Sequence, residues 1–387
     1  MTEAEQLLGD AVALRRAIHA NPEVGLDLPA TQQAVLSSLD GLGLELYTGE
    51  RVSSVVAVLD GASAGPTTLL RADMDALPMT EDTGLDFASR TADAMHACGH
   101  DAHVAMLVEA ARLLADRRSQ LAGRVVFMFQ PGEEGYAGAR FMLEEGLVER
   151  HGPIDRAHAL HITPLIAAGA VATRAGTLMA SSDAFVVTVT GRGGHASTPH
   201  DALDPIPVAC EIVGALQSMI TRRVSVFDPA VLTVASIMAG TTSNVIPETA
   251  VIRGTVRAVS DQSRETVLEG LRRVVEHVAA AHGCTASIAP MAVPYPVTVN
   301  SGPDADRMIE VASSILGEDR AIRLPSPVMG AEDWSFVLQK VPGAMAFLGA
   351  RPPGDGPVAP NHSNRMIIDE DAMSTGIALH VALALAP

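Results

Sequence analysis

Two side chains that commonly bind metal ions lie close together in the segment MHACGHDAH, residues 95–103. Cys98 and His100 are separated by a single glycine, and cysteine thiolate and histidine imidazole are both good ligands for zinc and similar divalent ions. The pair by itself is equally compatible with an inert buried cysteine beside a polar loop. Further ligands elsewhere in the chain are therefore needed before a metal site can be predicted here.

A pair of adjacent acids follows the apolar segment VVFMFQ, residues 125–130. Glu133 and Glu134 are flanked by proline and glycine residues, which are typical of a turn. Neighbouring side chains at a turn can point apart, so that one carboxylate binds a metal while the other acts on water as a general base. A solvated acidic turn is the commoner explanation for such a pair, and only the position at a strand end, beside other ligand types, makes a metal site a serious alternative.

Three further segments carry histidines that could complete a metal site or act in catalysis. Either His158 or His161 in AHALHITP could be a ligand, although histidines that only form hydrogen bonds are also common. His362 lies in the loop PNHSN, and His195 follows three glycines in GRGGHASTPH. The glycine spacing before His195 is not that of a dinucleotide-binding turn, and the sequence has neither a Walker A lysine nor a Gly-x-Ser-x-Gly nucleophile.

The elements before residue 180 predict an α/β domain that brings some of these side chains together. Helical patterns near 3–19 and after Asp101 alternate with strand-like patterns near 54–59, 67–72 and 124–130. Such alternation favours a mostly parallel sheet, in which functional loops gather beyond the carboxyl ends of the strands. RADMDALP (71–78) and FQPGEEG (129–135) each follow a strand, so we expect their acids at that edge.

A different pattern begins near Ser181 and predicts an inserted domain. The segment DAFVVTVT, residues 183–190, alternates apolar and polar residues as a half-exposed strand does. The elements that follow are a helix at 205–221, strands at 231–240 and 249–259, a helix at 263–282 and a strand at 285–290. This βαββαβ order is typical of a compact α+β unit with helices on one face of four strands. We therefore expect a discontinuous catalytic domain, 1–180 and 293–387, interrupted by a domain at 181–292.

The composition excludes several classes of function. The 387 residues are 48% hydrophobic, which is enough for a sizeable core and two domains. The formal net charge of −18 argues against nucleic-acid binding, which depends on Lys and Arg at phosphates. No apolar stretch fits a signal peptide or a membrane span, and three cysteines suit a reducing compartment better than a disulfide framework. We expect a cytoplasmic protein that binds neither nucleic acid nor membrane.

Taken together and in order, the motifs resemble those of the M20 metallopeptidase family, in its amidohydrolase branch of hippurate hydrolases, N-acyl-amino-acid deacetylases and auxin-conjugate hydrolases. The motifs are RRAIHANPEVG (15–25), RADMDALP, MHACGHDAH, FQPGEEG, LHITP (160–164), GRGGHAS (191–197), NVIPE (244–248), GTVRA (254–258), MGAEDWSF (329–336) and NHSN (361–364). The resemblance covers nearly the whole chain. It implies a zinc-peptidase-like catalytic α/β domain with a smaller inserted α+β dimerisation domain.

The resemblance also implies roles for individual residues. Two divalent metal ions, which could be Zn, Mn, Co or Ni, would be bound by Cys98, His100, Glu134, His161 and His362. Glu133 would be the general base. His161 is preferred over His158 because the family ligand comes just before a short apolar step and a proline, as in HITP.

One position departs from the broader peptidase pattern. Arg71 stands where those enzymes have a histidine ligand, which fits the amidohydrolase branch, and Asp73 would orient the ligands. The resemblance implies that His195 reaches the active site of a partner subunit. Asn244 and Arg257 match substrate-contacting positions, with Arg257 suited to a substrate carboxylate; a surface arginine on a strand is the alternative. The acids Glu332 and Asp333 would support the site or lie at a helix N-terminus.

The resulting prediction is a homodimeric metal-dependent hydrolase that cleaves the amide bond of N-acyl or N-aroyl amino acids. Its products would be a carboxylic acid and a free amino acid. A dipeptidase or aminoacylase acting on peptide-like substrates is one alternative. A catalytically inactive dimeric protein that binds ligands in the same pocket is another, and the retention of Glu133 with a full ligand set argues against it.

Overall fold

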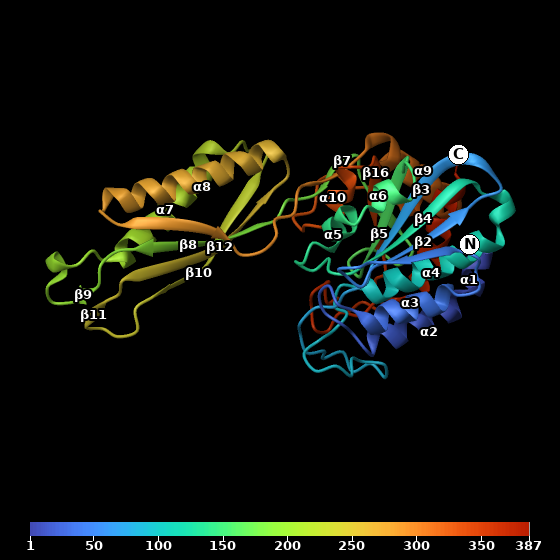
Figure 1. Ribbon diagram of the computed structural model, residues 1–387, viewed down its shortest axis with the longest axis horizontal. Helices are drawn as coiled ribbons and strands as arrows, with labels where there is room; N and C mark the ends of the chain where they lie inside the picture. Colours follow the sequence, from blue (N-terminus) through green and yellow to red (C-terminus); the bar gives the residue numbers. More distant parts are fainter. Residues whose placement is uncertain (387) are drawn as a thin grey trace. The chain divides into compact units, whose positions relative to one another are not determined.

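The computed structural model of the chain describes residues 1–386, which form two compact units (Figure 1). The first unit consists of Met1–Leu178, Val299–Ser326 and the chain from Asp333 onward. The second consists of Met179–Thr298 and Pro327–Glu332. The second unit therefore extends beyond residue 292, where the sequence predicts a return to the first domain, and it also includes a short later segment.

The first unit is built around an eight-stranded sheet with the strand order β1-β2-β4-β3-β5-β16-β6-β15. Its strands are β1 (Glu45–Thr48), β2 (Val55–Asp60), β3 (Ser63–Asp73), β4 (Ala122–Gln130), β5 (Arg156–Thr163), β6 (Val171–Thr173), β15 (Ala321–Arg323) and β16 (Gly343–Gly349). The central strands β4, β3, β5 and β16 run parallel, whereas β2 against β4 and β6 against β16 are antiparallel. This arrangement confirms the predicted α/β class.

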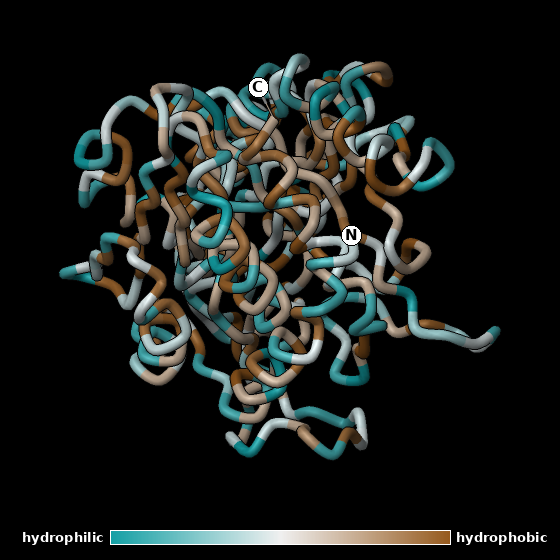
Figure 2. Tube along the Cα trace, turned by 90° about the vertical axis from the view of Figure 1, so that its right-hand side faces the viewer, coloured by the Kyte–Doolittle hydropathy of each residue, from teal (hydrophilic) through white to brown (hydrophobic). Residues whose placement is uncertain are grey.

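Helices cover this sheet. They are α1 (Thr2–Gln6), α2 (Leu8–His19), α3 (Pro29–Leu39), α4 (His100–Asp116), α5 (Gly138–Glu144), α6 (Leu147–Arg150), α9 (Gly302–Leu316), α10 (Trp334–Leu338) and α11 (Met373–Leu385). Most residues of α4 are buried, because α2, α3 and α11 pack against it. In Figure 2 the hydrophobic stretches of the chain lie mainly inside, whereas hydrophilic residues are frequent in the peripheral loops.

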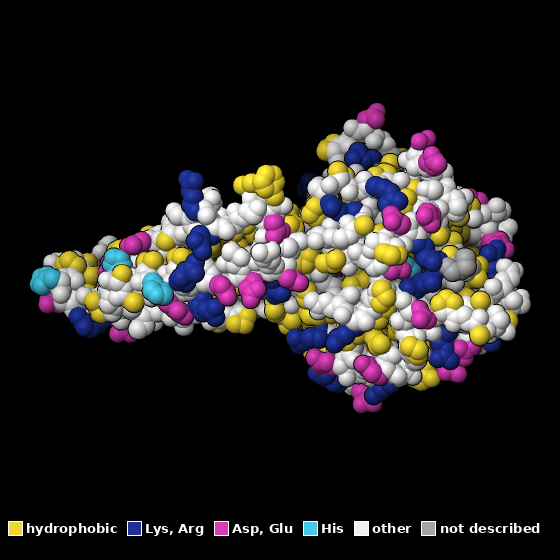
Figure 3. Space-filling view, turned by 90° about the horizontal axis from the view of Figure 1, so that it is seen from above, with side chains coloured by type: hydrophobic (Ala, Val, Ile, Leu, Met, Phe, Trp, Pro, Cys, Tyr) yellow, Lys and Arg dark blue, Asp and Glu magenta, His cyan; other side chains and the backbone are white. Residues whose placement is uncertain are grey.

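Short elements complete the list. The strands β7 (Gly176–Met179) and β14 (Thr298–Asn300) pair with each other, and four 3-10 helices lie at Arg118–Gln120, Pro199–Asp201, Glu318–Arg320 and Glu370–Ala372. Within residues 1–386, the helices are too short or too polar to cross a membrane. On the face of the molecule in Figure 3, acidic and basic side chains are interspersed.

The second unit has the predicted βαββαβ order. Its elements are β8 (Asp183–Thr190), α7 (Pro205–Arg223), β10 (Ala230–Ala239), β12 (Thr249–Ala258), α8 (Asp261–Ala281) and β13 (Thr285–Pro290). The antiparallel sheet has the order β10-β12-β8-β13, and α7 and α8 pack on it around a separate apolar core (Figure 1). Two short strands, β9 (Gly194–His195) and β11 (Val245–Ile246), form an additional pair that the sequence pattern did not predict.

Local sequence explains where the two long helices of this unit begin. The Asp204 side chain accepts a hydrogen bond from the Ile206 N–H at the start of α7, where Pro205 occupies the first helical position. Ser260 caps α8 in the same way, by accepting from the Ser263 N–H. Such side chains satisfy backbone donors that a helix leaves unpaired at its N-terminus.

Candidate metal centre

Three neighbouring parallel strands of the first unit end at the same edge of the sheet. The strands are β4, β3 and β5, and they end at Gln130, Asp73 and Thr163. The loop after β3 contains Asp75, the loop after β4 contains Glu133 and Glu134, and His161 lies near the end of β5. The structure therefore places the acids at the carboxyl edge of the sheet, as expected for loops of a parallel α/β sheet.

Cys98, His100 and His161 form the first group of candidate ligands. Their potential ligand atoms all lie within 4.8 Å of one another, and Sγ of Cys98 is 3.3 Å from Nε2 of His161. All three residues are buried. Gly99, between Cys98 and His100, has φ 88° and approaches Ile162 so closely that a Cβ would lie 2.4 Å from its Cγ2 atom. Only glycine fits this turn into α4.

Backbone carbonyls set the tautomers of the two buried histidines. Nδ1 of His100 lies 2.9 Å from the carbonyl oxygen of Asp75, and Nδ1 of His161 lies 2.9 Å from that of Ile162. A carbonyl oxygen can only accept a hydrogen bond, so each Nδ1 must carry the proton. With Nδ1 engaged in this way, Nε2 is the ring atom through which each histidine could bind a metal once that nitrogen carries no proton, and metal-binding histidines usually have this arrangement.

Glu134 and His362 form an overlapping group with Cys98. The candidate ligand atoms of the three residues lie within 4.8 Å of one another, and Nε2 of His362 is 3.2 Å from Oε1 of Glu134. His362 has a positive φ of 67°, and its N–H donates to the carbonyl of Ala97. The structure thus brings together all five residues that the sequence predicts as metal ligands, from four separate segments of the chain.

Glu133, the predicted general base, lies beside this cluster and is 6% exposed. It forms a close group with His100 and Glu134, and its Oε1 accepts a hydrogen bond from the Asp333 N–H at 3.3 Å. The carboxylate of Asp75 accepts from the N–H groups of both glutamates, at 2.9 Å to Glu133 and 3.0 Å to Glu134. Asp75 therefore fixes the turn that carries both acids. The sequence interpretation missed it, although it lies in the RADMDALP motif.

Arg71 is buried and donates hydrogen bonds to three polar side chains around the end of β3. Its guanidinium donates to Asp73 at 2.6 Å, to Gln130 at 3.0 Å and to Asp333 at 3.3 Å. Gln130 in turn donates to both carboxylate oxygens of Asp333. Arg71 thus compensates the buried carboxylates of Asp73 and Asp333, and the N–H of Asp333 in turn contacts Glu133.

Asp73, for which the family resemblance implies an orienting role, contacts two histidines of the site. Its Oδ1 accepts from Nδ1 of His103 at 2.5 Å, and its Oδ2 lies 3.3 Å from Nε2 of His100. Nε2 of His103 accepts from the Ile162 N–H at 2.8 Å, next to His161. His103 was not among the predicted site residues, although its place in MHACGHDAH, three residues after His100, was a signal for it.

The surroundings of His100 favour a positive charge. Burial alone would lower the pKa of His100, but Asp73 and Asp75 raise that pKa to about 10. Asp73 stays ionised for a related reason. Burial opposes its ionisation, yet Arg71 and His100 hold its pKa well below the usual range.

The other candidate ligands differ in the charge that their surroundings favour. Burial and the neighbouring His103 hold the pKa of His161 well below its usual value, which keeps its imidazole neutral. Burial opposes ionisation of Glu134, but His362 lowers its pKa, and Glu134 raises the pKa of His362 in return. The centre therefore combines a neutral imidazole with ionised carboxylates.

His158, the alternative to His161, lies outside the groups of ligand atoms. It is completely buried on β5, and neither ring nitrogen has a hydrogen-bond partner in the described part of the chain. Burial lowers its pKa to about 4. His158 therefore behaves as a neutral residue of the core.

His195 and Asn244 come together in the second unit. His195 on β9 pairs with Val245 on β11, and the Ala196 N–H donates to the carbonyl of Asn244. Nδ1 of His195 accepts hydrogen bonds from the N–H of Ser197 at 3.1 Å and from its hydroxyl at 2.7 Å. Because this nitrogen accepts a backbone N–H, Nε2 must carry the proton, so the ring presents a donor.

Arg257 lies on the four-stranded sheet, which is distinct from the β9–β11 pair. Arg257 lies near the end of β12, opposite Val231 on β10. The start of β12, at Thr249, is the end of that strand that follows β11 along the chain. The guanidinium of Arg257 donates to the carbonyl of Val256, and the side chain is half-buried. Within this unit, the structure does not bring Arg257 together with His195 and Asn244.

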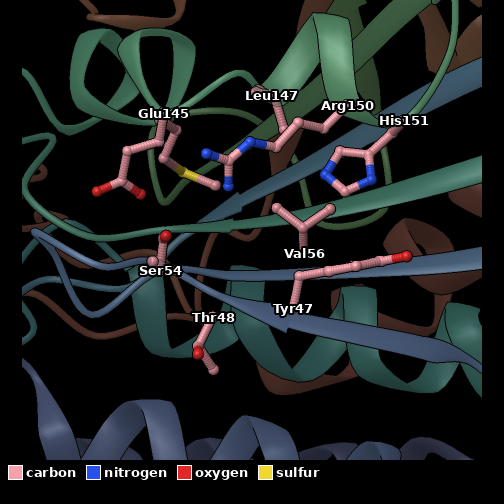
Figure 4. A pocket seen from close by; sticks show the side chains of 10 residues that line it. Tyr47, Thr48, Ser54, Val56, Glu145, Leu147, Arg150 and His151 are labelled. Carbon is pink, nitrogen blue, oxygen red and sulfur yellow. The ribbon is translucent and has the colours of Figure 1, made fainter.

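A separate hollow lies beside β1 (Figure 4). It has a volume of only about 40 Å³ and is lined by side chains that include Tyr47, Glu145, Arg150 and His151. The rings of Tyr47 and His151 pack against each other with their centroids 4.8 Å apart. None of the predicted ligands lines this hollow. It is therefore distinct from the candidate metal centre.

Comparisons with known proteins place the chain in a family of peptidases. The model of peptidase family M20/M25/M40 matches residues 69–386. Thermostable carboxypeptidase 2 of Saccharolobus solfataricus is 37% identical over 97% of this chain and 94% of its own length. N-acetylcysteine deacetylase of Bacillus subtilis is 35% identical, over 97% of this chain and 96% of its own. The crystal structure of Bacillus subtilis YXEP, described as a dinuclear metal binding peptidase, superposes with a TM-score of 0.82 at 30% identity, covering 98% of both chains.

Proposed function

Because this chain belongs to peptidase family M20/M25/M40, we propose that it is a metal-dependent amidohydrolase that cleaves the amide bond of N-acyl amino acids. Its products would be a carboxylate and a free amino acid. One observation carries the proposal, namely that five ligand-type side chains from distant segments converge beside a buried glutamate. The relative described as an N-acetylcysteine deacetylase supports the substrate class.

The residues of the centre fit two divalent metal ions. We assign Cys98, His100, Glu134, His161 and His362 as the ligands, which combine thiolate, imidazole and carboxylate donors suited to Zn, Mn, Co or Ni. Nε2 of His100 makes no hydrogen bond among residues 1–386, and its surroundings favour positive charge. When bound, divalent ions lower the pKa of a water molecule and polarise the carbonyl of an amide.

Glu133 is the proposed general base. Its carboxylate would take a proton from the water that attacks the amide carbon, and it would return a proton to the nitrogen that leaves as the amine. The Glu133 carboxylate accepts a hydrogen bond from the Asp333 N–H, and the Glu133 N–H donates to the Asp75 carboxylate. These two hydrogen bonds keep the Glu133 carboxylate in one orientation. A fixed orientation matters because a general base must stay within hydrogen-bond reach of the proton it moves.

We further propose that two copies form a homodimer in which His195 of one subunit acts at the active site of its partner. The Nε2–H of His195 would donate to the oxygen of the amide as it acquires negative charge. Strand β10 is an edge strand with exposed apolar side chains at Val231, Ile237 and Met238, and such an edge is suited to pairing with a second copy. Asn244 would contact the substrate beside His195.

Arg257 and the location of the protein complete the proposal. Arg257 would contact the carboxylate of a substrate, since a guanidinium can bind a carboxylate through two parallel hydrogen bonds. Cys98, Cys210 and Cys284 form no disulfide within the described residues, which supports the proposal of a reducing environment such as the cytoplasm.

A second candidate function is the hydrolysis of dipeptides or other peptide-like substrates. The relative described as a carboxypeptidase, at 37% identity, favours this alternative. Both functions use the same centre, so they differ only in the group on the acyl side of the scissile bond. A substrate panel separates them.

The test combines reconstitution with two matched variants. Metal-depleted protein would be supplied with Zn, Mn, Co or Ni ions and assayed against N-acetyl and N-benzoyl amino acids of both enantiomers and against dipeptides. We expect hydrolysis of the N-acyl amino acids to return with metal. Glu133→Ala should abolish turnover while metal content stays near normal, whereas Glu134→Ala should lose metal. No metal binding and no hydrolysis under any of these conditions would make the enzyme proposal wrong, and metal loss in Glu133→Ala would mean that the two glutamates exchange roles.

A further inference from the structure

Three ligand-bearing segments meet at one amide side chain. Nδ2 of Asn361 lies 3.0 Å from the carbonyl oxygen of Cys98 and 3.2 Å from that of Ile162. Asn361 is half-buried and directly precedes His362 in the chain. One side chain therefore links the Cys98 loop, the end of β5 beside His161 and the loop that carries His362.

The chemistry of these contacts requires an amide. Both acceptors are carbonyl oxygens, so the atom that faces them must be the NH2 group, which has two hydrogens to donate. The Ile162 carbonyl also accepts the Nδ1 proton of His161, and it therefore sets the orientation of that imidazole. Through this shared oxygen, Asn361 acts on the orientation of His161 as well as on the position of Cys98.

The backbone of the same loop needs to be held in place. His362 has a φ of 67°, in the left-handed region that residues other than glycine seldom adopt. Such a conformation persists only where surrounding contacts maintain it. The contacts here are the His362 N–H to the Ala97 carbonyl, together with the two hydrogen bonds from Asn361.

We propose that Asn361 is a positioning residue that aligns Cys98, His161 and His362 and thereby sets the affinity of the centre for divalent metal. The inference rests on the proposed assignment of these three residues as ligands. Residues that orient metal ligands typically contribute about 10–100-fold to metal affinity. Removing the amide is expected to act on metal binding first and on turnover only as a consequence.

Asn361→Asp is the sharpest variant, because it keeps the shape and places a carboxylate oxygen against two carbonyl oxygens. Asn364→Asp is the matched control. Asn364 lies in the same NHSN segment and is exposed, and the hydrogen bond that its backbone carbonyl accepts from the Asp82 N–H does not depend on its side chain. The Asn364→Asp substitution adds the same negative charge three residues away in the chain, so it distinguishes the loss of positioning from the effect of the added charge.

The experiment measures binding of Zn²⁺ and Co²⁺ to metal-depleted full-length protein by calorimetry, and it follows the thiolate-to-cobalt absorption that reports on Cys98. We expect Asn361→Asp to bind both ions about 10–100-fold more weakly than the wild type, with an altered cobalt spectrum. Asn364→Asp should resemble the wild type in both measurements. Excess metal should restore part of the lost turnover of Asn361→Asp.

The results separate this inference from the proposed function. Wild-type protein that binds neither ion would overturn the metal centre itself. Wild-type binding together with unchanged affinity and spectrum in Asn361→Asp would overturn only the role of Asn361. If Asn361→Asp fails to fold, the same measurements are made on Asn361→Ala, which removes both hydrogen bonds without adding repulsion. Wild-type metal affinity in Asn361→Ala would refute the positioning role of Asn361.

Discussion

Replacing Asp75 by asparagine tests whether this carboxylate holds the turn that carries Glu133 and Glu134. Asp75 is 1% exposed, and its two oxygens each accept one peptide N–H from that turn, at 2.9 and 3.0 Å. Asparagine has nearly the same shape but only one accepting oxygen. Its NH2 group would therefore face one of the two N–H donors, and that donor would be left without an acceptor.

The expected magnitude follows from these two bonds. A hydrogen bond to a charged group contributes about 1.5–3 kcal/mol, and a neutral one about 1 kcal/mol. Asp75→Asn loses one charged bond and weakens the other, so we expect the free energy of unfolding to fall by about 2–4 kcal/mol. A general base displaced by roughly 1 Å loses about 100-fold in rate, and we expect kcat to fall by this order.

The assay is urea unfolding together with kcat on the best N-acyl amino acid substrate. Asp319→Asn is the matched control, because Asp319 is exposed and should change stability by less than about 0.5 kcal/mol. Wild-type stability and wild-type kcat in Asp75→Asn would refute the idea that this carboxylate fixes the turn. A loss of stability with normal kcat would mean that Asp75 stabilises the turn in the wild type but that the position of the turn does not limit catalysis.

Two other predictions concern histidines. Burial lowers the pKa of His158 to about 4 and that of His380 to about 3. Below pH 6.5 these two histidines are therefore protonated in the unfolded chain but not in the folded chain. The free energy of unfolding should fall by about 1.4 kcal/mol per pH unit for each histidine as the pH drops from 6.5 toward 4. Urea midpoints between pH 7 and 5 test this, and a His380→Leu variant with an unchanged slope would contradict it. Ser197→Ala removes the hydroxyl that lies 2.7 Å from Nδ1 of His195. We expect about 2–10-fold lower kcat with normal metal content and, in ¹⁵N NMR spectra, a larger population of His195 with the proton on Nδ1. An unchanged imidazole spectrum would show that the hydroxyl does not set the tautomer.

The sequence predicts the α/β class and the βαββαβ order of the second unit, because both depend on local periodicity that does not require knowledge of distant contacts. The five candidate ligands and Glu133 were assigned from the resemblance of the ordered motifs to the M20 family, because the chemical type of each residue by itself left other roles open. The short strands β9 and β11 were missed, because two-residue strands have no periodicity to detect.

The tertiary structure decided how the candidate ligands are held. It places His161 rather than His158 within the group of ligand atoms, although both lie on β5. The supporting contacts join residues far apart in the sequence, such as Asn361 with Cys98 and Asp75 with Glu133. Several of them end on backbone N–H and carbonyl groups, which every residue possesses and which no sequence motif distinguishes. The sequence by itself therefore determined which side chains could bind metal, and only the folded chain determined the orientation of each, because the hydrogen bonds that set it exist only after the strands have paired.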